Sequence, residues 1–334
     1  MTYMAQETRE APDAAERFLK SNGEALAALG VSLRRMRPPV ILTSARGSSD
    51  NAAGYLKYLA EILLGVPCAS VGASVASLYG ARLKAKDALA VTISQSGKSP
   101  DIVALQNEMK RAGALTVAAV NDAESPAARD AALCLPLHAG PERSVAATKS
   151  CIVSLVAAAA IVASWLDDAE FRGAVSALPE QLRAAAHSEW PEFAGQLAKV
   201  ESLYVLGRGP SLPIAAETAL KLKETCAIHA EAYSAAEVMH GPLELVGEGF
   251  HVLAYAQSDA SLRSTTDAIV KLRAAGARVL VVGQGGLPVT APAHPLLEPI
   301  LMLQSAYLAI EELARRRGRN PDAPRMLRKV TETV

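Results

Sequence analysis

The sequence has few aromatic residues and no excess charge of either sign, and both shortages narrow the classes of protein it can be. Only 4% of its 334 residues are aromatic although 50% are hydrophobic, so alanine, leucine and valine must build most of the core. Lysine plus arginine and aspartate plus glutamate number 34 each, which gives a formal net charge of zero. With no basic surplus, we expect neither nucleic acid nor a membrane as a partner.

Metal-ligand spacings and long apolar runs are also missing. Cys68, Cys134, Cys151 and Cys226 are far apart and form no CxxC pair, and no His/Cys/Asp cluster has ligand spacing, so the sequence predicts no metal and no cofactor. The longest apolar run, Cys151–Leu166, is shorter than the roughly 18 residues of a membrane-spanning helix, so we expect a buried core helix. No signal peptide is visible, which favours a cytoplasmic location with free thiols.

What the chain does contain is a weak internal repeat. Three motifs recur at one offset of 162 residues: Arg46-Gly47 and Arg208-Gly209, Gln95-Ser96 and Gln257-Ser258, and Ser99 and Ser261. Each half alternates predicted strands and helices, with strands near 40–45, 88–93, 115–120 and 132–136, then near 202–206, 251–256 and 278–283. The alternation predicts an α/β protein of two tandem three-layer (αβα) domains, each a parallel sheet flanked by helices.

The domain limits follow from composition. We expect residues 1–18 to form a flexible, polar N-terminal segment, residues 19–168 the first domain, and residues 195–334 the second. The stretch from about 167 to 199 is polar and helical in character, and the boundary is predicted there.

The turn SQSGKSPD, which follows an apolar run in the first half, has the features of a phosphate-binding loop. A loop that leaves a parallel strand and opens a helix presents free N–H groups and the positive end of the helix dipole. Ser94, Ser96 and Ser99 add hydroxyl groups, and Gly97 lets the backbone approach a ligand. The alternative is that Ser96 or Ser99 only caps the helix. The second half has Asp259 at the position of Gly97, and this asymmetry favours phosphate binding by the first half.

Five segments together resemble the sugar isomerase (SIS) family, in particular the isomerase part of glucosamine-6-phosphate synthase and the SIS-type amino-sugar-phosphate deaminases. They are ARGSSDNA, SQSGKSPD, ERSVAATKS, ALKLKETCAIHAEAYSAAEVMHGPLELV and PRMLRKVTETV. The resemblance extends from about residue 20 to the C-terminus. It implies two tandem SIS domains and a phosphorylated amino sugar as the ligand.

The resemblance also implies which residues bind the sugar phosphate. The phosphate would be held by Ser49, Ser94, Gln95, Ser96 and Ser99, and the rest of the sugar would meet Val145 and Ala146, with Lys221 as a positioning residue. One departure is Ala147, where the synthase branch leads us to expect serine. The form SVAATKS is more similar to the deaminase branch.

Three residues carry the implied chemistry. By resemblance Glu224 is the base that moves a proton between C1 and C2, and His240 assists ring opening, supplied by the partner subunit of a homodimer. Lys329 would form a Schiff base with the ketose or only anchor the sugar. From the residues alone, Glu224 would instead be a solvated ion-pair partner, His240 a helix-end residue and Lys329 part of a basic tail.

The start MTYMAQ leaves no room for a glutaminase domain before the first half, so we expect no glutamine-dependent synthesis. The favoured activity is therefore conversion of glucosamine 6-phosphate to fructose 6-phosphate and ammonia. The first alternative is a deglycase or isomerase of another amino-sugar phosphate or of fructosamine 6-phosphate. A non-catalytic sugar-phosphate sensor is the second, and the absence of a helix-turn-helix domain and of a basic face argues against a transcriptional regulator of that kind.

Overall fold

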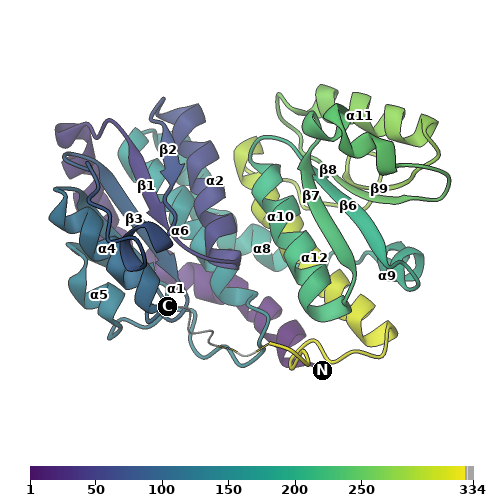
Figure 1. The fold of residues 1–334 in the computed structure, drawn as a ribbon, viewed down its shortest axis with the longest axis horizontal. Coiled ribbons are helices and arrows are strands. Elements are labelled where there is room, and N and C mark those ends of the chain that lie inside the picture. Colours follow the sequence, from purple (N-terminus) through teal and green to yellow (C-terminus); the bar gives the residue numbers. More distant parts are fainter. Residues whose placement is uncertain (328, 330–334) are drawn as a thin grey trace. The chain divides into compact units, whose positions relative to one another are not determined.

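A computed structural model describes residues 1–327 and 329, which divide into two compact units (Figure 1). The first-half unit comprises Ala11–Glu142, Lys149–Ala177 and Lys329, and the second-half unit comprises Met1–Glu10, Arg143–Thr148 and residues 178–327. The chain crosses from one unit to the other after Glu10, Glu142, Thr148 and Ala177. The predicted ranges 19–168 and 195–334 do not anticipate that residues 1–10 and 143–148 belong to the second-half unit.

The first-half unit is a five-stranded parallel sheet with the strand order β2-β1-β3-β4-β5. Its strands are β1 (Ile41–Ser44), β2 (Cys68–Ser70), β3 (Leu89–Ser94), β4 (Leu115–Val120) and β5 (Leu133–Pro136). One face is covered by α2 (Ser48–Leu63) and α6 (Lys149–Leu166), which pack on each other, and the other by α4 (Pro100–Arg111) and α5 (Pro126–Asp130) (Figure 1). The short α3 (Ser74–Ser77) and α7 (Ala169–Ser176) complete it.

The second-half unit repeats this plan with four parallel strands in the order β7-β6-β8-β9. The strands are β6 (Ser202–Gly207), β7 (His229–Ser234), β8 (His251–Ala256) and β9 (Arg278–Gly283). Helices α10 (Ser211–Lys221) and α12 (Glu298–Arg316) cover one face and α11 (Leu262–Ala274) the other (Figure 1). The remaining helices are α8 (Leu178–Ala185), α9 (Pro191–Leu197), the π-turn η1 (Leu222–Cys226) and the 3₁₀ turns η2 (Glu237–His240), η3 (Pro242–Leu245) and η4 (Pro295–Leu297).

The predicted α/β fold with two parallel sheets flanked by helices is therefore confirmed, and so is the repeat. Strand β3 begins at Leu89 and β8 at His251, and α4 begins at Pro100 and α11 at Leu262, each pair 162 residues apart. All seven predicted strands are present. The two that the prediction missed, β2 and β7, each lie at one edge of their sheet, and most of their residues are not buried. An edge strand needs no continuous apolar run, so its pattern is weak.

The expected flexible N-terminal segment is wrong. Residues Tyr3–Met36 form one helix, α1, and Met4, Ala11 and Phe18 on it are fully buried. These apolar residues recur every seven positions, which places them on one helical face, while the polar residues between them disguise the pattern. Burial of that face orders the segment, although its polar average composition had suggested a frayed end.

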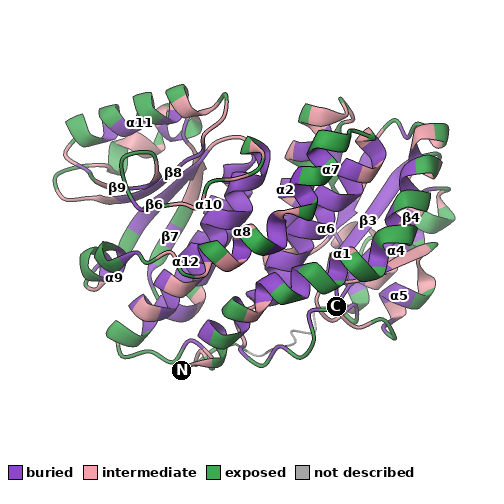
Figure 2. Cartoon of the chain, turned by 180° about the vertical axis from the view of Figure 1, so that it is seen from behind, coloured by how far each residue is buried: buried purple, intermediate pink, exposed green. Residues whose placement is uncertain are grey.

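Helix α6 is a core helix, as the sequence predicts. Among the described residues it is the one helix long and apolar enough to cross a membrane, but 89% of it is buried inside the protein. Figure 2 shows it in the colour of buried residues along most of its length. Its apolar surface is therefore used in packing within this fold.

The contact between α1 and α6 leads to a prediction. A Cβ at Gly30 would overlap the carbonyl of Ser164, whereas a Cβ at Gly23 on the same helix would meet nothing within 4 Å. We expect Gly30→Ala to lower the free energy of unfolding by about 1–3 kcal/mol, because backbone cannot move aside cheaply. Gly23→Ala should raise it by about 0.5–1 kcal/mol through helix propensity. Urea unfolding of both variants measures this, and an equal response of the two would contradict the close packing.

Candidate active site

The loops after β1 and β3 lie at the same edge of the first sheet, because these parallel strands are neighbours. The first loop leads into α2 and the second into α4, so two helix N-termini open at this edge. Arg46 of the first loop donates from Nε to Oδ2 of Asp101 over 2.6 Å, and Asp101 is buried in the first turn of α4. This ion pair ties the two loops together at the place where parallel α/β proteins bind ligands.

Within the turn after β3, the serine hydroxyls contact backbone N–H groups of the same turn. The N–H of Gly97 donates to Ser94 Oγ over 3.0 Å, and the N–H of Lys98 donates to Ser96 Oγ over 3.3 Å. Ser99 is the N-cap residue of α4, but its side chain makes no capping hydrogen bond. The Ser99 hydroxyl therefore does not cap α4, whereas the Ser96 hydroxyl, the other member of the capping alternative, does accept a backbone N–H within the turn. Gly97 has a φ of +63°, a conformation that favours glycine.

The corresponding turn of the second half is occupied by the protein's own carboxylates. Asp259 Oδ1 accepts from the N–H of Ser261 over 2.8 Å and from its hydroxyl over 2.5 Å. Glu298 accepts from the N–H of Ser258 over 2.5 Å and from its hydroxyl over 3.1 Å, and burial raises the pKa of Glu298. A second carboxylate at the same turn would repel a phosphate. The asymmetry between the halves therefore has a physical basis.

Glu224 belongs to a chain of charged groups in the second-half unit. Lys221 Nζ lies 2.5 Å from Glu224 Oε2 and 3.4 Å from Glu217 Oε1, and the Lys221 and Glu217 side chains are 1% and 0% exposed. The hydroxyl of Tyr307 on α12 donates to Glu217 Oε1 over 2.9 Å. Glu224 itself is 21% exposed, so it is the member of this chain that solvent or a substrate can reach.

A π-turn presents Glu224 in this position. Helix α10 ends at Lys221 and continues as η1, which carries Glu224 and is followed by Ala227 in the left-handed conformation at φ 50° and ψ 46°. Single π-turns are frequent at functional sites, and an alanine at positive φ is strained. The local backbone thus departs from regular geometry at the predicted base.

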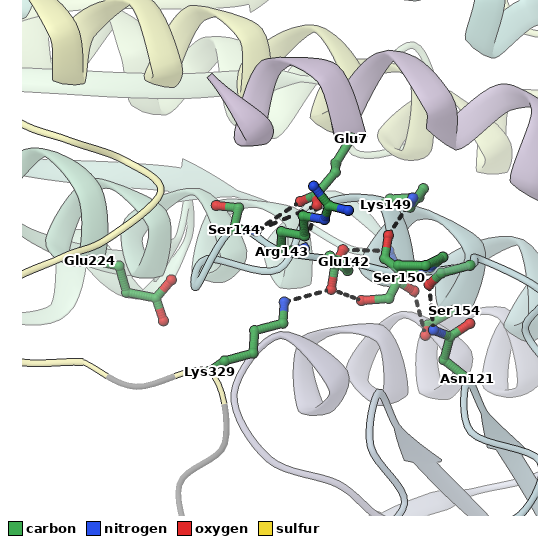
Figure 3. Close-up of polar contacts among 12 residues, drawn as sticks. Glu7, Asn121, Glu142, Arg143, Ser144, Lys149, Ser150, Ser154, Glu224 and Lys329 are labelled. Carbon is green, nitrogen blue, oxygen red and sulfur yellow. Dashed lines mark hydrogen bonds and ion pairs between the residues drawn. The ribbon is translucent and has the colours of Figure 1, made fainter. Parts of the chain in front are cut away.

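A second charged pair lies in the first-half unit. Lys329 Nζ is 3.0 Å from Glu142 Oε2, and Glu142 also accepts from the N–H and the hydroxyl of Ser150 over 3.0 and 2.8 Å (Figure 3). Burial alone would raise the pKa of Glu142, but the Lys329 ammonium and the Ser150 donors outweigh it and hold that pKa below its usual range. Sequence reasoning missed Glu142, although an acidic residue directly before the segment RSVAAT was a visible signal.

The structure distributes the predicted site residues over both units. Ser49, Ser94, Gln95, Ser96, Ser99 and Lys329 belong to the first-half unit, and Val145, Ala146, Lys221, Glu224 and His240 to the second-half unit. Of the latter, Lys221 and Glu224 are in direct contact, and His240 is exposed at the end of η2. Among residues 1–327 and 329, no three His, Cys, Asp or Glu side chains are grouped to hold a metal ion. The roles of these residues stay predictions.

Fold and site define a class of protein: a tandem pair of parallel α/β units, with a serine- and glycine-containing turn after β3 in one half and a buried Glu–Lys–Glu cluster in the other. Comparison with protein families identifies the class further. The SIS domain family matches residues 37–164 and 196–286, which is more than half of the chain. The chain therefore belongs to the SIS domain family.

Individual relatives agree with this assignment. A glutamine–fructose-6-phosphate aminotransferase (isomerizing) from Thermus thermophilus is 33% identical over 98% of this chain, which spans 58% of that relative's length. A structure assigned as a phosphosugar isomerase from Silicibacter pomeroyi is 44% identical, with a TM-score of 0.92 over 96% of this chain and 100% of that one. A glucosamine-6-phosphate deaminase from Thermotoga maritima shares the fold, with 22% identity and a TM-score of 0.80 over 99% and 100%.

Gly97 provides a test of the anion-binding turn. A Cβ there would overlap the Ser125 hydroxyl, and the φ of +63° is unfavourable for alanine. We expect Gly97→Ala to weaken binding of a phosphorylated sugar by about tenfold or more, because the turn must rearrange. Calorimetric titration with fructose 6-phosphate measures this. Gly140→Ala, at another positive φ but with nothing within 4 Å, is the control, and equal affinities in both variants would contradict the assignment.

Tyr307 provides a test of the buried acid–base chain. Tyr307→Phe removes the hydroxyl that donates to Glu217, so a buried carboxylate loses a partner. We expect the free energy of unfolding to fall by about 1–3 kcal/mol in urea denaturation. Tyr79→Phe, whose side chain is exposed, should change it by less than about 0.5 kcal/mol. A Tyr307 variant as stable as the Tyr79 variant would mean that the hydrogen bond contributes nothing.

Proposed function

We propose that this protein is a phosphosugar isomerase that converts glucosamine 6-phosphate to fructose 6-phosphate and ammonia. The observation that carries the proposal is the buried chain Glu217–Lys221–Glu224, which ends in a carboxylate that a substrate can reach. Membership of the SIS family, and the turn between β3 and the N-terminus of α4, support a phosphorylated sugar as the ligand. The fold shared with the Thermotoga deaminase agrees with it.

The proposed chemistry needs one base that serves two neighbouring carbons. In the open-chain aldehyde, the Glu224 carboxylate removes the proton from C2 while the aldehyde oxygen takes up a proton, which gives an enolamine. The protonated Glu224 then returns the proton to C1 and the amino nitrogen loses one, which leaves a hydroxyl group at C1 and an imine at C2. Water adds to that imine, and ammonia leaves, so that glucosamine 6-phosphate and water become fructose 6-phosphate and ammonia. Lys221, held between two carboxylates, keeps Glu224 oriented and balances its charge.

The other predicted residues have supporting roles in this scheme. Ser49, Ser94, Gln95, Ser96 and Ser99 would hold the phosphate, and Val145 and Ala146 would contact the sugar. His240 would assist ring opening. Its exposure on η2 suits donation across a homodimer interface, which we propose as the assembly.

For Lys329 the contact with Glu142 supports an anchoring role. Its ammonium donates to a buried carboxylate whose lowered pKa keeps it ionised. A protonated amine donates hydrogen bonds to sugar oxygens but cannot attack a carbonyl. In the proposed reaction the substrate nitrogen already supplies the imine, so a Schiff base with Lys329 is not required.

Ala147 favours a second candidate activity. A methyl group at this half-buried position offers no hydroxyl to the sugar, which suits a different amino-sugar phosphate or a fructosamine 6-phosphate. The fold and the base would be the same. Only the pattern of accepted sugars separates the two candidates.

The deciding experiment measures ammonia release from glucosamine 6-phosphate, with detection of fructose 6-phosphate, beside galactosamine 6-phosphate and fructosamine 6-phosphate. We expect turnover of the first substrate and a loss of at least about 10³-fold in kcat for Glu224→Gln, because the amide cannot accept the proton. Glu201→Gln, an exposed glutamate of the same unit, is the matched control and should retain activity.

Each outcome assigns a function. Turnover of another sugar that depends on Glu224 would move the activity to the second candidate. Full activity of Glu224→Gln would contradict the mechanism. Binding of these sugars without turnover of any would favour a sensor.

A further inference from the structure

The segment Arg143–Thr148 has no helix or strand of its own to satisfy its backbone. It is nevertheless largely covered, since Ser144 is 0% and Ala146 is 1% exposed. Covered N–H groups require acceptors, and here these come from distant parts of the chain. Their origin shows what holds the segment that carries Val145 and Ala146.

Glu7 provides the acceptors for the first two residues. Its carboxylate, 3% exposed, accepts from the N–H of Arg143 and, over 3.2 Å to Oε2, from the N–H of Ser144 (Figure 3). One carboxylate thus receives two successive backbone donors. Hydrogen bonds to an ionised acceptor are stronger than those between neutral groups.

The C-terminal segment provides the next acceptors. The N–H of Val145 donates to the carbonyl of Asp322 over 3.0 Å. The Asp322 carboxylate in turn accepts from the N–H groups of Tyr3 and Met4 over 2.8 and 2.7 Å, and so caps helix α1. Tyr3 and Glu7 are four residues apart and lie on one face of α1. A closed ring of hydrogen bonds therefore joins α1, the Arg143–Thr148 segment and Asp322. Asp322 precedes Lys329 by seven residues.

Helix α12 supports this ring. Thr2 Oγ1 donates to Glu311 Oε1 over 2.8 Å, and Gln304 Nε2 donates to the carbonyl of Thr8 over 2.7 Å. Both partners are on α12, the helix whose Tyr307 holds Glu217. The Arg143–Thr148 segment and the Glu217–Lys221–Glu224 chain thus share one rigid support within the second-half unit.

We propose that Glu7 is a positioning residue, which acts through the N–H groups of Arg143 and Ser144 to hold Val145 and Ala146 in the conformation that meets the sugar phosphate. The proposal rests on the proposed function for the identity of the ligand. Glu7 and Asp322 both lie outside the residues that the family model matches. The acceptors that hold the Arg143–Thr148 segment therefore come from outside the matched SIS ranges.

The test compares Glu7→Gln with Glu24→Gln, an exposed glutamate on the same helix. Glutamine retains one acceptor oxygen but turns an NH₂ group toward the second backbone donor. We expect the amides of Arg143 and Ser144 to exchange with solvent about tenfold faster in Glu7→Gln, with the exchange of α6 unchanged. With glucosamine 6-phosphate, KM should rise by about tenfold while kcat changes by less than about threefold. Glu24→Gln should match the unmodified protein in both.

The two readouts separate this proposal from the proposed function. Unchanged amide exchange in Glu7→Gln overturns the positioning role, whatever the activity. A fall in kcat at constant KM also overturns it, because displacement of a binding segment acts on KM. If the unmodified protein neither binds nor converts glucosamine 6-phosphate, the proposed function fails, and amide exchange alone decides on Glu7.

Discussion

Buried carboxylates that need donors organise the irregular segments of this protein. Asp101 pairs with Arg46 and joins two loops at the edge of the first sheet, and Glu142 gathers Lys329 and the first turn of α6. Glu7 and Glu217 do the same in the second-half unit. A carboxylate removed from water is stable only with such partners, so each one imposes a definite position on the backbone or side chain that supplies them. The parallel sheets supply the rigid frame on which this pairing acts.

The pairing of carboxylates with donors also distinguishes the corresponding turns of the two halves. In each unit a serine-containing turn connects a strand to a helix, β3 to α4 in the first and β8 to α11 in the second. Both turns therefore have backbone N–H donors and the positive end of a helix dipole. In the first half the N–H groups of Gly97 and Lys98 donate to neutral serine hydroxyls, so this turn carries no carboxylate. In the second half Asp259 and Glu298 take up the backbone donors from within the chain. The second-half unit instead carries the lysine held between two glutamates, so the proposed binding and proton-transfer roles fall on different copies of one architecture.

The two ends of the chain have a role that the repeat does not suggest. Helix α1 begins in the second-half unit and continues into the first, and Asp322 caps it from the C-terminal side. This arrangement places residues close to both termini beside the Arg143–Thr148 segment. Binding residues in α/β proteins are often on loops, and a loop is held in a definite position by the groups that contact it.

Local patterns in the sequence determined seven of the nine strands among the described residues, the repeat of 162 residues and the core helix α6. The central strands gave the clearest pattern, because strands buried on both faces must be apolar throughout. The same patterns singled out the turn from Ser94 to Ser99 and, by resemblance, Glu224. Tertiary structure alone decided the short or largely uncovered strands β2 and β7, the order of α1, and the partners Glu142, Glu7 and Tyr307. Hydrogen bonds between residues more than 80 positions apart leave no periodic trace in the sequence, and only the folded chain brings a donor to a buried carboxylate.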